Sequence, residues 1–332
     1  MPNSPESAED RLIARYFRPL AKHPGALGLV DDAAVIAPPP GCDVVLTTDG
    51  VISGVHIFPD DRPENIGRKA LRMNLSDLAA KGATPAGFVL TLALRGADEA
   101  WLTPFARGLG EDTGLFACPL LGGDTVSTAG PLMISITAFG RIPHARMVHR
   151  RGAKPGDRVV VTGTIGDAAL GLDILKGGAV AAALAEDAAA KEMLVGRYRV
   201  PQPRHALAKA VRDHAHAAMD VSDGLAGDLA KLCAASGVSA VIDAASVPLS
   251  AAAASLCARG AVGIETLVSG GDDYEILCAI PENRFEAFAQ AAGLAGVAVA
   301  SIGTVIAGVS TPGFLDAQGR EIPLKRLSYS HF

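Results

Sequence analysis

Residues 120–125, LLGGDT, end an apolar run with two glycines, a carboxylate and a hydroxyl. Five further segments place aspartate beside glycine, hydroxyl or small residues: 31–35 DDAAV, 46–51 LTTDGV, 74–82 NLSDLAAKG, 219–225 MDVSDGL and 269–276 SGGDDYEI. A single Asp-Gly pair usually marks a turn, but six such segments are harder to explain as turns alone. Several place the acid where a strand ends or a helix begins, which is where α/β folds build ligand sites.

The composition bounds the class of protein. The chain has 332 residues, of which 49% are hydrophobic and 5% aromatic, so two ordinary domains with small-residue cores are expected. A formal charge of −5 lacks the basic footprint of a nucleic-acid-binding protein. The polar, acidic N-terminus and the absence of an apolar run of about 18 residues predict neither a secretory signal nor a membrane helix. The five cysteines are scattered without a C-x-x-C pair, which favours a reducing cytoplasm over a disulfide or zinc framework.

Strand and helix patterns alternate along the whole chain. Ser7 and Asp10 form a capping box before an amphipathic helix, 43–58 alternates like a strand, and 62–82 is typical of a long helix ending at Gly82. A turn signal at 152–156 marks a plausible domain boundary. We therefore predict a two-domain protein of mixed α/β, α+β type, with an N-terminal domain over 1–149 and a C-terminal domain over 150–332.

The acidic segments favour a hard cation. Asn74 and Asp77 are spaced i, i+3 and face one side of the predicted helix, and Asp220 and Asp223 have the same spacing. Carboxylates that converge without lysines or arginines between them would repel one another, and Mg²⁺ or Mn²⁺ would resolve this repulsion. Because protein-bound Mg²⁺ usually bridges carboxylates to substrate phosphates, a polyphosphate ligand is expected.

Glycines and one arginine fit a phosphate ligand. Gly122, Gly123, Gly270 and Gly271 would let the backbone approach phosphate closely. Arg150 is either a forked phosphate ligand or a solvated turn arginine, and spacing alone does not separate the two.

Several well-known motifs are absent from the sequence. There is no G-x-x-x-x-G-K-[ST], G-x-S-x-G or H-E-x-x-H segment, which excludes a P-loop, a nucleophile elbow and a zincin site. Residues 159–171 carry glycines after a strand but miss the G-x-G-x-x-G spacing. The acids of 220–228 do not have EF-hand spacing.

The ordered set of motifs resembles a known family. The segments DDAAV, TTDG, GVHIF, NLSDLAAKGA, LGGDT, HRRGAKPGD, DVSDGL, GGDDYE and a closing YSHF are similar to those of thiamine-monophosphate kinases. That family belongs to the aminoimidazole-ribonucleotide-synthetase-like superfamily of ATP-dependent enzymes. The resemblance covers nearly the whole chain. It implies phosphorylation of thiamine phosphate to thiamine diphosphate by ATP with several Mg²⁺ ions. It also implies a homodimer in which the N-terminal sheet pairs across the two subunits.

The resemblance also implies roles for individual residues. Those matching the family's metal ligands are Asp32, Thr47, Thr48, Asp49, Asp77, Asp124, Asp220 and Asp223. Those matching its ATP contacts are Gly123, Asp124, Arg150 and Ser222. Those matching its thiamine phosphate contacts are His56, Asp272 and Tyr329. No general base is implied, because the accepting phosphate is already an anion.

Two positions depart from the family's pattern, and the motifs argue against several rival functions. Asp272 stands where other members often have Glu, and Ile57 where Phe is common, which affects fine substrate contacts and not the reaction.

A selenophosphate synthetase would need an N-terminal catalytic Cys, and no cysteine precedes Cys42. A hydrogenase-assembly factor would need a C-terminal Cys, whereas this chain ends in His331 and Phe332. Aminoimidazole ribonucleotide synthetase lacks this combination of motifs, and a plain metal-binding structural protein would leave the glycines unexplained.

Overall fold

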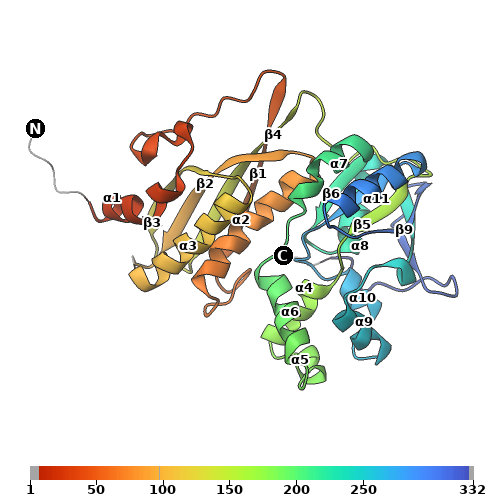
Figure 1. Cartoon of the computed structure of the whole chain (residues 1–332). Helices are drawn as coiled ribbons and strands as arrows, with labels where there is room; N and C mark the ends of the chain where they lie inside the picture. Colours follow the sequence, from red (N-terminus) through yellow and green to blue (C-terminus); the bar gives the residue numbers. More distant parts are fainter. Residues whose placement is uncertain (1–6, 97, 329–332) are drawn as a thin grey trace, which may run out of the picture. The chain divides into compact units, whose positions relative to one another are not determined.

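The chain divides into two compact units in a computed structural model that describes residues 7–96 and 98–328 (Figure 1). The first unit contains Met1–Leu78 and Thr84–Ala145, and the second contains Ala79–Ala83 and Arg146–Phe332. Each unit has its own mixed sheet with helices packed on it. The predicted mixed α/β class is confirmed.

The first unit begins with a short helical region and then builds a four-stranded sheet. Ser7 caps the first helix, and the predicted capping box with Asp10 is present. The helical elements are α1 (Ala8–Leu12), η1 (Ile13–Phe17), η2 (Arg18–Leu20), η3 (Pro24–Leu29), α2 (Pro63–Ala80) and α3 (Glu99–Leu115). The strands are β1 (Cys42–Ile52), β2 (Thr84–Leu94), β3 (Leu120–Ser127) and β4 (Met133–Pro143), in the order β1-β4-β2-β3.

The sheet of the first unit has one apolar face covered by helices. Figure 1 shows α2 and α3 on one face of the strands. Alternate residues of β4, including Ile134, Ile136 and Ala138, are fully buried. On the other face of β1, Val44 and Leu46 are 37% and 60% exposed. The sheet therefore has one packed face and one that carries exposed aliphatic side chains.

The second unit is built on a six-stranded sheet in the order β10-β7-β9-β5-β8-β6. Its strands are β5 (Arg158–Thr162), β6 (Ala217–Val221), β7 (Val238–Asp243), β8 (Glu275–Ile280), β9 (Val299–Ala307) and β10 (Gly313–Leu315). Its helices are α4 (Asp167–Leu175), α5 (Ala179–Ala183), α6 (Ala188–Arg199), α7 (Ala208–His214), α8 (Leu225–Ser236), α9 (Ala251–Ala258), α10 (Ile264–Val268) and α11 (Phe285–Leu294). Three short 3₁₀ turns complete it, η4 (His205–Leu207), η5 (Ala244–Ser246) and η6 (Glu282–Arg284).

The central strands of the second unit are buried on both faces. Val159 and Val161 belong to one apolar cluster and Val160 to another, because successive side chains of a strand point to opposite faces. Strand β8 divides in the same way, with Leu277 on one side and Ile276 on the other. These strands are therefore continuous apolar runs and not alternating patterns.

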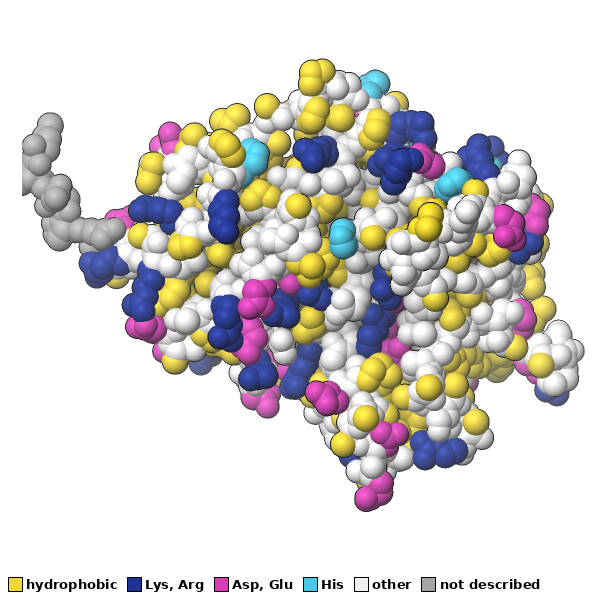
Figure 2. Space-filling model, viewed as in Figure 1, with side chains coloured by type: hydrophobic (Ala, Val, Ile, Leu, Met, Phe, Trp, Pro, Cys, Tyr) yellow, Lys and Arg dark blue, Asp and Glu magenta, His cyan; other side chains and the backbone are white. Residues whose placement is uncertain are grey.

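The described residues include no helix that is both long and apolar enough to span a membrane. On the face seen in Figure 2, acidic and basic side chains are interspersed and do not form separate patches. This distribution agrees with the lack of a basic footprint in the sequence.

Candidate active site

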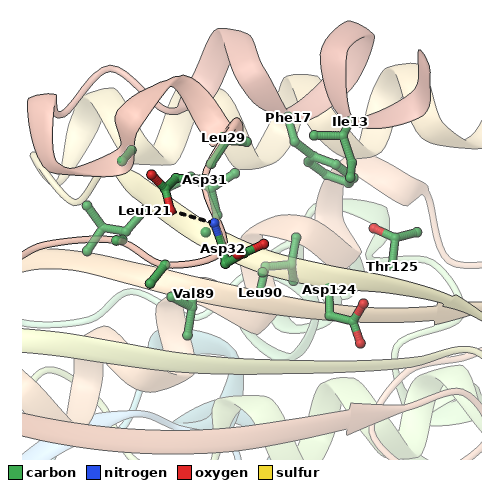
Figure 3. A pocket seen from close by; sticks show the side chains of 16 residues that line it. Ile13, Phe17, Leu29, Asp31, Asp32, Val89, Leu90, Leu121, Asp124 and Thr125 are labelled. Atoms are coloured by element: carbon green, nitrogen blue, oxygen red, sulfur yellow. Dashed lines mark hydrogen bonds between the residues drawn. The ribbon is translucent and has the colours of Figure 1, made fainter. Parts of the chain in front are cut away.

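A cavity of about 260 Å³ lies within the first unit, beside strand β3 (Figure 3). Its polar lining comes from Asp31, Asp32 and residues 122–125. Ile13 and Phe17 of η1 contribute part of its apolar lining. The cavity combines oxygen donors with an apolar wall, as a site for an amphipathic ligand requires.

Two predicted metal ligands, Asp32 and Asp124, line this cavity. Asp32 is exposed and its backbone N–H donates to Asp31 Oδ1 at 2.8 Å. The LLGGDT segment lies within β3, where successive side chains alternate in direction. Asp124 points to the opposite side of β3 from Thr125 (Figure 3). Asp32 and Asp124 therefore line the same cavity from different segments of the first unit.

A second group of predicted ligands lies where β1 meets α2. The Thr47 hydroxyl donates a hydrogen bond to the Asp77 carboxylate. Asp49 is two residues along β1 and so shares the face of Thr47. Thr48 faces the other way, where its hydroxyl donates to the Ile136 carbonyl at 3.1 Å. The structure therefore groups Thr47, Asp49 and Asp77 and excludes the Thr48 side chain from that group.

His56 lies in a turn after β1 and not on a strand. Its Nδ1 accepts a hydrogen bond from the Ile52 N–H at 3.2 Å. In the neutral ring the proton is therefore on Nε2. The His56 carbonyl accepts from the buried Lys69 ammonium at 3.0 Å, which holds the turn in place.

In the second unit, Asp220 and Asp223 leave strand β6 and lead into α8. Asp220 lies in β6 and is 6% exposed, and Asp223 lies in the following turn. The i, i+3 spacing predicts that this pair shares one helix face, as Asn74 and Asp77 do on α2. For Asp220 and Asp223 that interpretation is wrong, because the segment leaves a strand and is not helical.

The turn is held by Asp228, in the first turn of α8. Its fully buried carboxylate Oδ2 accepts hydrogen bonds from the backbone N–H groups of Ser222, Asp223 and Gly224 at 3.1, 3.0 and 3.2 Å. Burial raises the pKa of Asp228, although Lys231 and the backbone amide of Asp223 oppose the rise. Asp228 therefore fixes the backbone conformation of the predicted nucleotide-binding turn.

Lys231 lies between two of these carboxylates. Its Nζ donates to Asp223 Oδ2 at 2.5 Å and to Asp228 Oδ1 at 2.9 Å. Burial alone would lower the pKa of Lys231, but the two carboxylates outweigh burial and raise it. The expectation that no lysine lies between the converging carboxylates is therefore wrong at this position.

The 270–275 loop is fixed to the 220–224 turn through its backbone. The Asp272 N–H donates to the Ser222 carbonyl and the Tyr274 N–H to the Val221 carbonyl, both at 2.8 Å. Asp272 and Tyr274 have φ values of +69° and +52°, which non-glycine residues seldom adopt. Such strain persists only where the surrounding structure enforces it, and it is common at functional sites.

Buried charges on either side of Tyr274 hold the loop. Glu275 is fully buried and accepts hydrogen bonds from Arg197 at 2.8 Å, from Arg204 Nε at 2.6 Å and from Thr162 at 2.6 Å. Asp273 accepts the backbone N–H groups of Gly166 at 2.7 Å and of Ala168 at 3.3 Å. Burial raises the pKa of Asp273 to about 8.

The glycines of these loops have a packing role. A Cβ on Gly271 would lie 2.6 Å from the Ser222 carbonyl oxygen, and one on Gly123 would lie 2.0 Å from that of Leu90. One on Gly270 would lie 2.3 Å from the Ala169 side chain. Close approach of the protein's own chain therefore explains three of the four glycines that were predicted to make room for phosphate.

Arg150 is exposed and lies in the loop before β5. Ser236, at the end of α8, accepts hydrogen bonds from the N–H groups of Gly152 and Ala153 at 3.1 and 3.2 Å. The same hydroxyl lies 3.4 Å from the Arg150 carbonyl oxygen. The backbone of this loop is therefore anchored while the Arg150 side chain stays accessible.

The fit of these residues to a metal follows from their chemistry. The hydroxyls and carboxylates of the predicted set are the oxygen ligands that Mg²⁺ prefers. No three His, Cys, Asp or Glu residues in the described ranges are grouped closely enough to hold a metal ion. Substrate oxygens and water would therefore have to complete the coordination, as is usual for Mg²⁺ with phosphates. Tyr329, a predicted substrate contact, lies outside the described residues.

Sequence reasoning missed the residues that support the predicted site. Asp228 and Lys231 are spaced i, i+3 on the helix that follows DVSDG, a pattern that predicts an ion pair on one helix face. Arg197 and Arg204 contact Glu275 from distant segments, and no local pattern links them to it.

Both units match family models. Residues 30–142 match the N-terminal domain of AIR synthase related proteins, and residues 154–313 match the C-terminal domain. Over 324 residues the chain is 45% identical to the thiamine-monophosphate kinase of Caulobacter vibrioides, which covers 96% of this chain and 89% of the relative. It is 39% identical over 326 residues to the thiamine-monophosphate kinase of Escherichia coli K12, covering 98% of each chain.

Solved structures agree with the sequence comparisons. The thiamine-monophosphate kinase of Stenotrophomonas maltophilia matches with a TM-score of 0.82 and 37% identity, covering 94% of this chain and 96% of that one. AaThiL complexed with AMPPCP and TMP matches with a TM-score of 0.77 and 30% identity over 91% of each chain. The predicted two-domain architecture is confirmed by these likenesses. The chain belongs to the thiamine-monophosphate kinase family of the AIR synthase related proteins.

Proposed function

We propose that this thiamine-phosphate kinase transfers the γ-phosphoryl group of ATP directly and in line to the phosphate of thiamine phosphate, giving thiamine diphosphate. The observation that carries the proposal is the likeness over 91% of the chain to a structure holding AMPPCP and TMP together. Direct transfer requires both ligands in one site, because proximity of the reacting groups supplies much of the catalysis.

We propose that the metal is Mg²⁺ and that more than one ion is bound with the nucleotide. The residues that would hold the ions are Asp32, Thr47, Asp49, Asp77, Asp124 and Asp220, and Thr48 is left out because its side chain faces away from Thr47 and Asp77. Mg²⁺ would neutralise phosphate charge and align the donor and acceptor phosphates. Asp223 is already paired with Lys231, so we leave it out of this set.

The protein's own residues position the reactants. The accepting oxygen belongs to a phosphate that is anionic near neutral pH, so no side chain has to remove a proton from it. The backbone of Ser222 is fixed by Asp228, and Gly123 and Asp124 are exposed on β3. Together with the accessible Arg150, these residues form the proposed ATP contacts.

The substrate contacts that we propose are His56, Asp272 and Tyr329. An imidazole N–H such as that of His56 is a donor of the kind that binds a phosphate oxygen. Asp272 lies in a loop whose backbone is bonded to the Ser222 turn, and its carboxylate suits the positive thiazolium ring of thiamine. Tyr329 would add an aromatic face for the same cation.

A homodimer and a cytoplasmic location complete the proposal. Val44 and Leu46 on the open face of the first unit's sheet are exposed aliphatic residues of the kind that subunit interfaces bury. We propose that this sheet pairs with the same sheet of a second copy. All five cysteines are free thiols, which suits a reducing compartment.

A coupled ADP-release assay tests the reaction. Purified protein with ATP and Mg²⁺ should release ADP with thiamine phosphate and not with thiamine or with aminoimidazole precursors. Release that is equal for all acceptors, or absent with thiamine phosphate, would contradict the proposal. Chromatography should show thiamine diphosphate formed in equal amount to ADP.

A further inference from the structure

Lys231 forms an unusual bridge beside the predicted nucleotide-binding turn. Its ammonium is 2.5 Å from an Asp223 oxygen and 2.9 Å from an Asp228 oxygen. The Asp228 side chain is fully buried, whereas the side chains of Lys231 and Asp223 are 40% and 39% exposed. The bridge therefore joins a fixed, buried carboxylate to one at the surface.

Asp228 has no capacity left for a metal ion. One of its oxygens accepts three backbone N–H groups and the other accepts Lys231. A divalent ion at Asp228 would have to break these bonds and leave buried amide donors unpaired, which costs free energy. Asp223 is therefore the only carboxylate of this pair that a metal could use.

Lys231 already occupies the cation position beside Asp223. Its removal from that position would also take it away from the buried Asp228, because one ammonium serves both carboxylates. A charge-assisted hydrogen bond to a buried carboxylate is among the stronger bonds in a protein. Lys231 is thus held by Asp228 and in turn holds Asp223.

We infer that Lys231 is a built-in cation of the nucleotide side of the site, and that it keeps Asp223 from acting as a metal ligand. The ammonium supplies one fixed positive charge where a carboxylate pair would otherwise attract a divalent ion. Two of its three hydrogens are used by Asp223 and Asp228. The placement of Lys231 on the nucleotide side of the site rests on the proposed function. The effect of Lys231 on metal binding at Asp223 does not depend on it.

Direct Mn²⁺ binding tests the inference without any turnover. Electron paramagnetic resonance counts free Mn²⁺ during titration of the full-length protein without nucleotide. The variants are Lys231→Gln, Asp223→Asn and the double variant, with Lys191→Gln as a control. Gln at 231 keeps a hydrogen-bond donor for Asp228 while removing the charge. Lys191 is half-buried and its ammonium donates to the Ala185 carbonyl at 3.2 Å.

The expected pattern is a gain of binding that depends on Asp223. Lys231→Gln should bind one more Mn²⁺ per chain, at a concentration about tenfold or more below that needed by wild type, because the repulsion by the ammonium is gone. The double variant should lose this gain, while Asp223→Asn and Lys191→Gln should match wild type.

Two outcomes overturn the inference. One is that Asp223→Asn binds one Mn²⁺ fewer than wild type, since Asp223 would then be a metal ligand despite its contact with Lys231. The other is an unchanged isotherm for Lys231→Gln. Lys231→Met provides a second neutral variant if circular dichroism shows that the Gln protein is unfolded. If wild type releases no ADP with thiamine phosphate, the proposed kinase reaction is wrong, but the Mn²⁺ comparison among the variants remains valid.

Discussion

The acids of the two units are held in different ways. In the first unit, Asp32 and Asp124 are exposed on a loop and an edge strand. In the second unit, Asp228, Asp273 and Glu275 are fully or almost fully buried and bonded to backbone amides or guanidinium groups. Exposed carboxylates can change partners when a ligand arrives, whereas buried ones set the shape of the loops. Asp32 and Asp124 of the first unit are therefore proposed ligands, whereas the buried acids of the second unit fix the backbone around Ser222 and Asp272.

The strongest test of this comparison removes a carboxylate from the first unit. Asp124→Asn or Asp77→Asn should lower kcat on the order of 1,000-fold, the loss typical of a preorganised charge at a reacting centre. The melting temperature of the metal-free protein should stay the same or rise, because repulsion among acids is relieved. Steady-state kinetics and calorimetry measure the two effects. Near-normal turnover would show that the substituted carboxylate does not contribute to catalysis.

Removing a buried acid from the second unit should instead reduce stability. Asp228→Ala leaves three backbone donors and Lys231 without their partner, so the free energy of unfolding should fall by about 3 kcal/mol. Urea denaturation measures this change. Asp243→Ala is a matched control, because Asp243 is exposed and caps only a short 3₁₀ turn. An equal loss of unfolding free energy in the two variants would show that buried and exposed acids do not differ in their contribution to stability.

Arg150 combines both properties, since its loop is anchored and its side chain is exposed. Arg150→Ala should reduce kcat/KM for ATP by about 1.5–3 kcal/mol of transition-state stabilisation, the value of a hydrogen bond to a charged group. The melting temperature should not change. Arg151→Ala, the exposed neighbour, serves as the control. An unchanged kcat and ATP KM would assign Arg150 to the solvated surface.

Substitutions at the proposed substrate contacts should have smaller effects than those at the proposed metal ligands. Asp272→Asn removes a charge while retaining a residue that tolerates a left-handed backbone. This variant and Tyr329→Ala should each raise the KM for thiamine phosphate by an amount equivalent to about 0.5–2 kcal/mol, with ATP affinity unchanged. Kinetics with each substrate varied in turn measure the split. Loss of ATP affinity with an unchanged thiamine phosphate KM would show that these residues face the nucleotide.

The pH dependence of stability tests a buried acid of the second unit. The pKa of Asp273 is raised by burial to about 8 from an ordinary value of 3.8, so the folded protein binds this proton more tightly than the unfolded chain does. Stability from this group is complete below pH 3.8 and decreases as pH rises toward 8. Asp273→Asn should flatten the slope between pH 5 and 8 in urea titrations. An identical slope in wild type and Asp273→Asn would show that Asp273 does not titrate between pH 5 and 8 in the folded protein.

The sequence predicted the pieces of the site better than their arrangement. The capping box at Ser7 and the helix ending near Gly82 follow from local rules, and both are present. The opposite directions of Thr47 and Thr48 also follow from strand alternation once β1 is known. The burial of Glu275 between two arginines could not be predicted, because residues about 70 to 80 positions apart form it. Long-range ion pairs have no local sequence pattern.

Helix α8 has a consequence for which sequence changes the protein can accept. Asp228 near its start fixes the Ser222 turn, and Ser236 at its end anchors the Arg150 loop. The helix has 12 residues, so it sets a spacing of about 18 Å between its ends. One inserted residue would lengthen it by about 1.5 Å and turn one end by about 100° relative to the other. Substitutions on its surface should be tolerated during divergence, whereas insertions and deletions within it should be selected against.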